Sequence, residues 1–203
     1  MPLIDPYGQV RSHSPRLPAT ILGLSGSLRR GSFNTMLLRA AVEVQPPGTT
    51  IDIGSIRGIP LYDADVEAAE GIPAGVQELK ARITAADGLL ISTPEYNNSI
   101  PGVLKNAVDW LSRPGTDIPR VFGGLPVAII GATPGAGGTI LAQAAWLPVL
   151  RTLGTAPWFG GRLIVSTAGK VFDEDGRLLD QTVRARLETF VAGFAAFVTE
   201  RRR

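Results

Sequence analysis

Short apolar runs alternate with longer amphipathic stretches along this chain from Ala19 onward. The apolar runs have the length and aliphatic content of buried strands, and we expect strands at residues 19–24, 50–53, 88–92, 125–130 and 161–165. Elsewhere apolar residues recur at intervals of three and four, which predicts helices at residues 34–44, 74–86, 102–111, 139–153 and 182–199. Pro148 lies inside the fourth of these helices, where we expect a kink or a break.

This alternation is typical of βαβ units around a parallel sheet. Because crossovers between parallel strands are right-handed, few arrangements of five strands are open. We predict a doubly wound α/β fold with helices on both faces of the sheet, most simply in the flavodoxin-like strand order 2-1-3-4-5. Ligands of such sheets bind beyond the carboxyl ends of the strands, where the strand order reverses. The functional loops should therefore follow the first, third and fourth strands.

Length and composition fit one globular domain. The chain has 203 residues, of which 44% are hydrophobic and 19% are charged, and this is enough to build one core. We divide it into a proline-containing N-terminal extension at residues 1–17, without a secretory pattern, and one domain at residues 18–203. No apolar run reaches the roughly 18 residues of a membrane span. We therefore expect a cytoplasmic protein without a membrane partner.

The residue inventory restricts the chemistry. The sequence contains no cysteine and a single histidine, His13, so cysteine-ligated metals and thiol catalysis are excluded and we predict no metal site. Redox chemistry would depend on a cofactor. Lysine and arginine exceed aspartate and glutamate by 20 to 18, and the excess lies in the C-terminal arginines at 201–203. Scattered arginines and 6% aromatic residues do not indicate a nucleic-acid partner.

The segment that joins the first strand to the first helix has the composition of an anion site. It reads SGSLRRGSFN at residues 25–34. Its glycines permit tight turns, its serines supply hydroxyls, Asn34 stands where we expect the helix N-cap, and the helix N-terminus offers free N–H groups. Arg29 or Arg30 would add a charge-assisted hydrogen bond. The segment matches neither a dinucleotide fingerprint nor a P-loop, so a phosphate monoester fits better than a pyrophosphate. Because hydroxyls, glycines and a guanidinium all fall between a strand and a helix, we favour a phosphate site over a solvated turn.

Two further loops complete the candidate site. The loop TPEYNNSIPG at residues 93–102 carries two prolines and an aromatic residue, and a flat heteroaromatic ring could stack on Tyr96 there. A plain surface loop is the equal alternative. The loop GATPGAGG at residues 131–138 contains four glycines, whose backbone N–H groups can approach a ligand closely.

The runs GSLRRGSFN, TPEYNNSIPGVLKNAVDW and ATPGAGG together resemble the NAD(P)H-dependent FMN reductases of flavodoxin-like fold, which include bacterial quinone, chromate and azo-dye reductases. The resemblance spans about residues 20–200. It implies an oxidoreductase that uses FMN, with NADPH or NADH as co-substrate, and passes two electrons to a small acceptor such as a quinone, an azo compound, chromate or free flavin. A flavodoxin-like electron carrier without turnover is one alternative, disfavoured by the basic isoelectric point, and a non-flavin phosphate-sugar binder is another.

Residue by residue, the resemblance implies that five side chains surround the FMN phosphate: Ser25, Ser27, Arg29, Ser32 and Asn34. The isoalloxazine would be bordered by Pro94, Glu95, Tyr96 and Asn97, and on its opposite side by Thr133, Gly135 and Gly137. No side chain is assigned a catalytic role, because the flavin carries the chemistry. The helix around residues 142–148 is more apolar than is usual for the family. This apolar helix, together with one exposed flavin edge that a second subunit could close, predicts a homodimer, with a tetramer as the alternative.

Overall fold

The computed structural model describes residues 18–202, so the predicted extension at residues 1–17, with His13, lies outside the described residues. The division of the chain into an extension and one domain stays a prediction. The strands are β1 (Ala19–Ser25), β2 (Thr49–Gly54), β3 (Gly88–Ser92), β4 (Pro126–Ala132), β5 (Ala156–Pro157) and β6 (Leu163–Val165). The α-helices are α1 (Phe33–Glu43), α2 (Ala64–Glu70), α3 (Ala74–Ala85), α4 (Gly102–Leu111), α5 (Ile118–Val121), α6 (Ile140–Thr152) and α7 (Gln181–Glu200).

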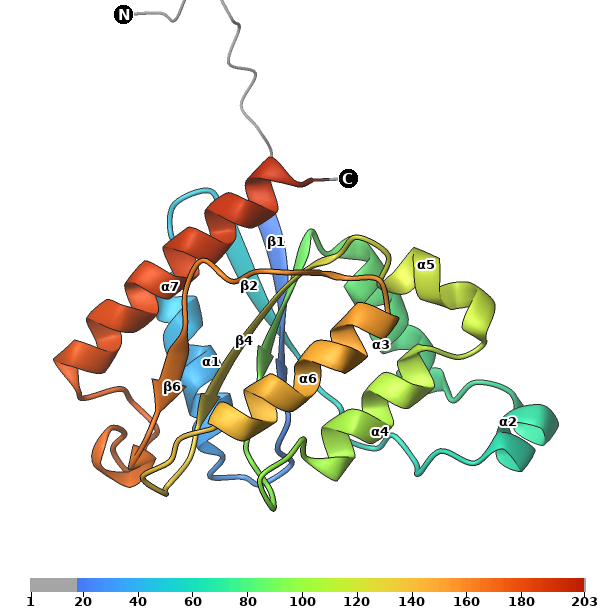
Figure 1. The fold of residues 1–203 in the computed structure, drawn as a ribbon, viewed down its shortest axis with the longest axis horizontal. Coiled ribbons are helices and arrows are strands. Elements are labelled where there is room, and N and C mark those ends of the chain that lie inside the picture. The colour runs from blue at the N-terminus through green and yellow to red at the C-terminus, as the bar shows by residue number, and fades with distance from the viewer. Residues whose placement is uncertain (1–17, 203) are drawn as a thin grey trace, which may run out of the picture.

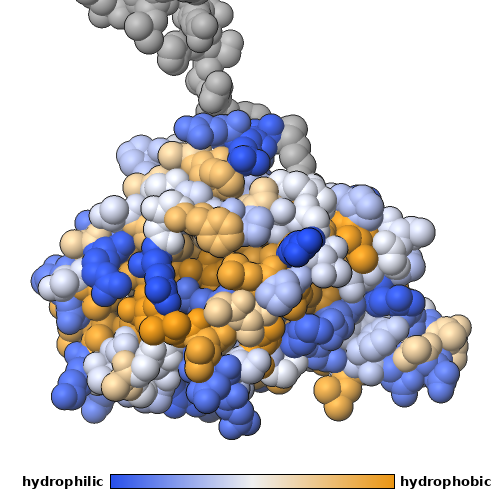
Figure 2. Space-filling model, in the orientation of Figure 1, coloured by the Kyte–Doolittle hydropathy of each residue, from blue (hydrophilic) through white to orange (hydrophobic). Residues whose placement is uncertain are grey.

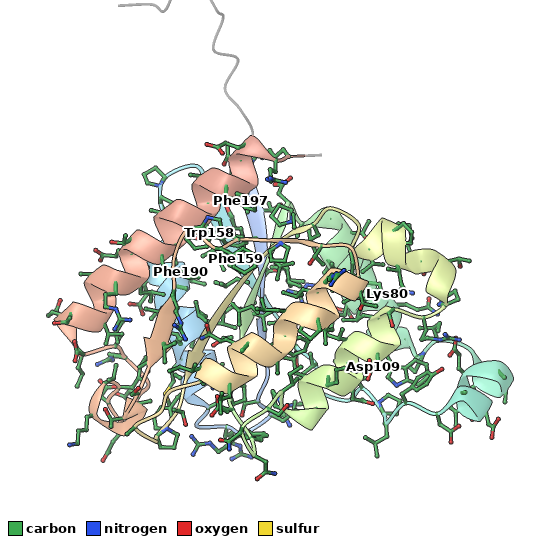
Figure 3. All side chains as sticks on the ribbon, viewed as in Figure 1. Lys80, Asp109, Trp158, Phe159, Phe190 and Phe197 are labelled. Carbon is green, nitrogen blue, oxygen red and sulfur yellow. The ribbon has the colours of Figure 1, made fainter. Side chains whose placement is uncertain are left out.

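The strands form one parallel sheet in the order β2-β1-β3-β4-β5, and β6 also pairs with β4. This confirms the predicted order 2-1-3-4-5 (Figure 1). The fifth position is shared by β5 and β6, where the sequence predicts one strand. Between them the chain leaves the sheet, and the Trp158 ring packs against Phe190 and Phe194 of α7, at centroid distances of 4.9 and 5.8 Å (Figure 3).

Helices cover both faces of the sheet and divide the core in two. On one face α1 and α7 pack against the sheet, and on the other face α3, α4, α5 and α6 do so. Strand β3 contributes to both sides, because Leu90 points into the first cluster while Leu89 and Ile91 point into the second. Side chains alternate along a strand, so a continuous apolar run is what a central strand needs.

Helix α6 is continuous from Ile140 to Thr152 through Pro148, so a break at the proline is excluded and a kink there stays a prediction. A proline removes the hydrogen bond to the carbonyl four residues earlier, here that of Ala144. Both Ala144 and Pro148 are exposed, so the carbonyl that loses its partner lies on the solvent side of α6. None of the helices between residues 18 and 202 is long and apolar enough to cross a bilayer.

Helix α2 and the segment before it were not predicted, because they carry no amphipathic pattern and α2 buries no residue. Polar contacts hold them against α4 instead. The Trp110 indole is fully buried, and its Nε1–H donates to the Pro60 carbonyl oxygen at 2.9 Å. Glu67 of α2 forms an ion pair of 2.8 Å with Arg113 just beyond α4. The long connection from β2 to α3 is therefore attached at two points, Pro60 and Glu67.

Candidate functional site

Three loops meet at the carboxyl edge of the sheet, as the fold predicts. The Gly26 N–H donates to the Ser92 carbonyl oxygen at 2.8 Å, which brings the β1–α1 loop beside the β3–α4 loop. A Cβ atom at Gly26 would lie 2.8 Å from Pro94 Cδ and 2.9 Å from Leu104 Cδ2. Only glycine allows this approach, so the small residue after β1 sets the spacing of the two loops.

Helix α1 is capped by Ser32, whose hydroxyl accepts from the Thr35 N–H at 3.3 Å. The prediction that Asn34 is the N-cap is therefore wrong. The cap residue must have extended dihedrals, and Ser32 has them, with φ −72° and ψ 119°. The two residues lie close together in sequence and are both polar, so composition alone could not separate them.

The Asn34 side chain instead forms buried hydrogen bonds with two strands of the sheet. Its Oδ1 accepts from the Ala132 N–H at 2.9 Å and from the Ser92 hydroxyl at 3.0 Å, and its Nδ2 donates to the Ala132 carbonyl oxygen at 2.8 Å. The side chain is 3% exposed. It thus joins α1 to the ends of β3 and β4, and fixes the position of the first loop relative to the third.

The β3–α4 loop contains a two-residue hairpin turn. Asn97 and Asn98 have φ values of 51° and 60°, and Tyr96 and Ser99 exchange both backbone hydrogen bonds, at 3.2 and 3.0 Å. Two consecutive left-handed residues make a type I′ turn, which asparagine tolerates better than most residues. The turn leaves the Tyr96 side chain 49% exposed at the edge of the site.

Glu95 connects this second loop to the start of α6, the helix that follows the third loop. Its Oε2 accepts from the backbone N–H groups of Leu141 and Ala142, at 2.8 and 3.0 Å. These N–H groups belong to the first turn of α6, where Thr139 makes no side-chain cap. A carboxylate at this position satisfies unpaired donors and interacts favourably with the helix dipole.

The glycine-containing loop after β4 is supported by residues that the sequence analysis did not single out. The Thr133 N–H donates to the Val165 carbonyl oxygen and the Thr167 N–H donates to the Gly135 carbonyl oxygen, both at 3.0 Å. Gly135 N–H is 3.4 Å from the Thr133 hydroxyl, and Gly137 is exposed. The segment after β6 therefore forms a fourth loop at this edge. The sequence feature that could have identified this fourth loop is its position directly after the strand predicted at residues 161–165.

A cavity of about 360 Å³ adjoins the first loop. Ser25, Ser27 and Arg29 line it, as the anion-site prediction requires. Residues 53–57, at the end of β2 and just beyond it, form another wall that was not predicted. The prediction placed ligand chemistry after the first, third and fourth strands only, so the end of the second strand was overlooked.

Comparison with known proteins shows the family of this chain. Residues 19–170 match the family described as NADPH-dependent FMN reductase. The chain belongs to this family. It is 45% identical over 168 residues to an NAD(P)H-dependent FMN reductase of Pseudomonas aeruginosa, covering 83% of this chain and 89% of that protein. It is 41% identical over 177 residues to a 2-hydroxy-1,4-benzoquinone reductase of a Burkholderia species, covering 87% and 94%.

Among solved structures, this FMN reductase is similar to the flavoenzyme NAD(P)H:(acceptor) oxidoreductase FerB from Paracoccus denitrificans, with a TM-score of 0.81 and 31% identity. The match covers 91% of this chain and all of that one, 100%. The predicted family, the flavodoxin-like fold, the oxidoreductase class and the use of FMN with NAD(P)H are thereby confirmed.

The residues present fit an FMN reductase. Hydroxyls, a guanidinium and the start of α1 surround the cavity beside the first loop, which suits a phosphate monoester. The exposed Tyr96 ring and the backbone of residues 133–137 offer surfaces for a flat ring system. The position of each of these residues relative to bound FMN is a proposal, developed below.

Proposed function

We propose that this FMN reductase passes two electrons from NADPH or NADH to a small quinone at the carboxyl edge of the sheet, beyond the ends of β1 and β3. The observation that carries this proposal is the joining of three loops at that edge. Asn34 links the first loop to the third, and Glu95 links the second to α6. A site whose walls are held together in this way is preorganised for a rigid cofactor.

The cofactor phosphate is assigned to the first loop. Ser25 and Ser27 would donate their hydroxyls, and Arg29 would supply a charge-assisted hydrogen bond. The Arg29 guanidinium lies 5.3 Å from the centre of the Phe33 ring, a cation–π contact that places it at the start of α1. Ser32 and Asn34 are both buried, and their bonds within the protein support this helix start.

The isoalloxazine is assigned to the space between the second and third loops. It would be bordered by Pro94, Glu95, Tyr96 and Asn97 on one side and by Thr133, Gly135 and Gly137 on the other. FMN supplies the redox chemistry when it is bound. Residues 18–202 contain neither histidine nor cysteine, so the part of the protein in this proposal is to bind and orient both partners.

A quinone is favoured as the acceptor because the similar Burkholderia protein is named for one. To test this, the protein is purified, its visible spectrum is recorded with and without added FMN, and NADPH oxidation is followed with 1,4-benzoquinone. We expect a flavin spectrum and steady oxidation. A colourless protein indifferent to FMN would contradict the cofactor assignment. A yellow protein that does not turn over with the quinone, but does so with an azo dye, chromate or free flavin, would contradict the acceptor.

A homodimer is the proposed assembly, with a tetramer as the alternative. Helix α6 exposes Ile140, Leu141 and Leu147 at 42%, 49% and 42%, and the neighbouring Phe159 is 75% exposed. Figure 2 shows apolar residues gathered over α6 and in the hollow beside it, which is lined by α6, β4 and residues 157–162. Apolar surfaces of this kind favour association. The cytoplasmic location stays a prediction of the sequence.

A further inference from the structure

The cavity beside the first loop extends away from the space proposed for the flavin ring. Its walls come from the β1–α1 loop, from α1, and from the end of β2 and the residues after it. None of its lining residues belongs to the β3–α4 or β4–α6 loop. In the sheet β2 and β3 lie on opposite sides of β1. The cavity therefore opens on the β2 side of the first loop, whereas the proposed ring site is on the β3 side.

This cavity carries an unusual concentration of positive charge. Its lining includes no acidic residue and four arginines: Arg29, Arg30, Arg39 and Arg57. Within residues 18–202 none of the four forms an ion pair. The nearby Arg82 and Arg184, in contrast, are paired with Asp52 and Glu43. The chain as a whole has a net charge of only +2, so this charge is concentrated locally.

Arg57 is held in place. Its Nη2 donates to the Leu28 carbonyl oxygen at 2.5 Å, and its backbone N–H donates to the Ser55 hydroxyl at 3.1 Å. The contact with Leu28 uses one of the five guanidinium donors and leaves the rest for a ligand. A guanidinium that is positioned in advance loses less entropy on binding.

Arg39 lies on the same side of α1 as Thr35, one turn further along, and both line the cavity. The Thr35 hydroxyl donates to the Ser25 hydroxyl at 3.0 Å. Thr35 and Ser25 thus connect the part of the cavity formed by the first loop with the part that holds Arg39. Two anionic groups could therefore bind side by side, one at each part.

The positive charge of the arginines that line this cavity exceeds the negative charge of one phosphate. A phosphate monoester carries about −1.5 to −2 at pH 7, and Arg29, the loop serines and the start of α1 already match it. Arg39 and Arg57 remain on the β2 side. NADPH differs from NADH only by a 2′-phosphate monoester, and arginine binds such a group through paired hydrogen bonds. We propose that Arg39 and Arg57 bind the 2′-phosphate of NADPH and make the enzyme prefer NADPH over NADH.

This inference rests on the proposed function, because it assumes that FMN fills the first-loop part of the cavity. It is tested on the FMN-loaded protein with Arg39→Ala, Arg57→Ala and the double variant. The matched control is Arg151→Ala, which removes an exposed arginine from the last turn of α6. Calorimetry measures binding of 2′-phosphoadenosine 5′-phosphate, with 5′-AMP as the probe that lacks the 2′-phosphate. Initial rates give kcat/KM for NADPH and for NADH with the same quinone.

We expect the wild type to bind the 2′-phosphorylated probe at least tenfold more tightly than 5′-AMP. Each single variant should lose about tenfold of this binding and of kcat/KM for NADPH, which is the effect of a charge-assisted hydrogen bond. The values for NADH and for FMN retention should stay within twofold of wild type, and the control should match wild type throughout. Arg57→Lys should keep part of the preference, because it keeps the charge without the fork.

Two results would overturn the proposal while leaving the proposed function intact. In one, the variants lose FMN and the ratio of NADPH to NADH efficiency is unchanged, so the whole cavity serves the cofactor phosphate. In the other, the wild type oxidises both nicotinamides equally and binds the two probes equally. A failure of the proposed function would look different, since no nicotinamide would be oxidised with any acceptor. The calorimetric comparison would still decide whether the 2′-phosphate binds.

Discussion

At the scale of single residues, the site depends on buried polar side chains whose partners lie far away in sequence. Asn34 makes three hydrogen bonds to residues 58 and 98 positions along the chain. A buried polar group is costly unless it is paired, and here the pairing also connects two strand ends to a helix. Such a side chain contributes to both the stability of the fold and the shape of the site.

Replacing Asn34 by alanine should lower the free energy of unfolding by about 2–3 kcal/mol, because buried backbone groups at Ala132 lose their partner. Urea denaturation measures this change. Ser27→Ala is the control, since Ser27 is only half-buried, and its unfolding free energy should stay within about 0.5 kcal/mol of wild type. If Asn34→Ala unfolds like wild type and only FMN affinity falls, the side chain acts on the cofactor directly and the structural assignment is wrong.

Arg29→Ala should raise the dissociation constant of FMN about tenfold or more, because a charge-assisted hydrogen bond contributes about 1.5–3 kcal/mol. Fluorescence titration of the flavin-free protein measures the constant, and circular dichroism checks that the fold is intact. Arg151→Ala should leave the affinity unchanged. An unaltered FMN affinity in Arg29→Ala would mean that the phosphate lies elsewhere.

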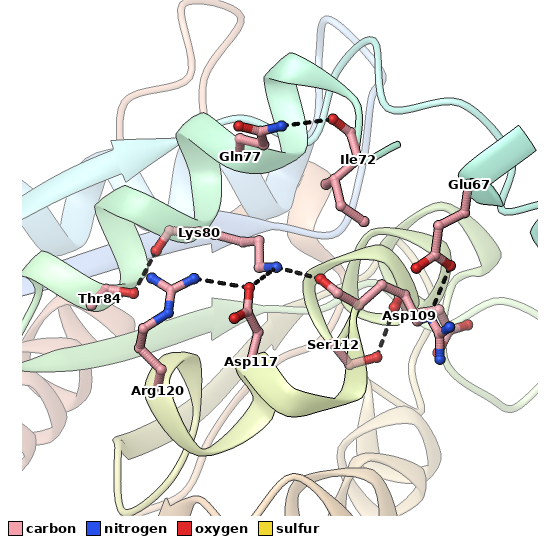
Figure 4. Close-up of polar contacts among 10 residues, drawn as sticks. Glu67, Ile72, Gln77, Lys80, Thr84, Asp109, Ser112, Asp117 and Arg120 are labelled. Atoms are coloured by element: carbon pink, nitrogen blue, oxygen red, sulfur yellow. Dashed lines mark hydrogen bonds and ion pairs between the residues drawn. The ribbon is translucent and has the colours of Figure 1, made fainter. Parts of the chain in front are cut away.

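At the scale of elements, helix ends and helix contacts are stabilised by groups from other segments. Helix α6 has no side-chain cap of its own and takes the carboxylate of Glu95 instead. Helix α3 buries Lys80 at 4% exposure and contacts the segment after α4 through it. Figure 4 shows the Lys80 ammonium bonded to the Asp117 carboxylate at 2.5 Å and to the backbone carbonyl oxygen of Arg113.

Glu95→Ala should destabilise the protein by about 1–2 kcal/mol, since it leaves two N–H groups of α6 without an acceptor and removes a charge from the helix N-terminus. Glu95→Gln keeps an acceptor and should lose less than half of this. Thermal unfolding measures both variants. Equal losses in the two would indicate that the charge, and not the hydrogen bonds, carries the effect.

The Lys80 and Arg120 side chains both bond to Asp117 and hold the pKa of its carboxyl below the ordinary value of 3.8. A carboxyl whose pKa is lower in the folded chain stabilises the fold above its unfolded pKa and loses that contribution as the pH falls through its folded pKa. Asp117→Asn should therefore lower the Tm by several degrees at pH 7, and the difference from wild type should shrink as the pH falls below 3.8.

The control is Asp109→Asn, because Asp109 pairs with Lys105 at the surface, where the side chains are 43% and 41% exposed. Exposed pairs contribute little, so this variant should unfold near the wild-type temperature at each pH. An equally large Tm difference between Asp117→Asn and wild type at pH 3 and pH 7 would assign the effect to packing rather than to the charge.

For the whole molecule, the apolar side of α6 with Phe159 is an exposed surface that the proposed cofactor site does not use. Leu147→Glu should disrupt the proposed dimer, because it introduces a charge that would be buried between subunits. Size-exclusion chromatography with light scattering measures the mass. Leu179→Glu, at a leucine that is 57% exposed outside this surface, should leave the mass unchanged. A wild-type protein that stays monomeric at high concentration would contradict the proposed homodimer.

The α/β class, the strand order and the three loops could be predicted from the sequence, because they follow from periodicity and from the geometry of parallel sheets. The prediction for β3 is accurate to the residue, since a fully buried central strand needs an uninterrupted apolar run. Helix α2 was missed for the opposite reason, as it buries nothing and has no pattern to detect.

The partner of each polar residue could be identified only in the folded chain. The structure shows that Ser32 caps α1 while Asn34 binds the strand ends, that Glu95 caps α6, and that residues after β2 complete the arginine-lined cavity. Each of these contacts joins segments that are distant along the chain or chooses between adjacent residues of similar chemistry. Local patterns record burial and backbone preference, whereas such contacts depend on where the packed sheet places each loop.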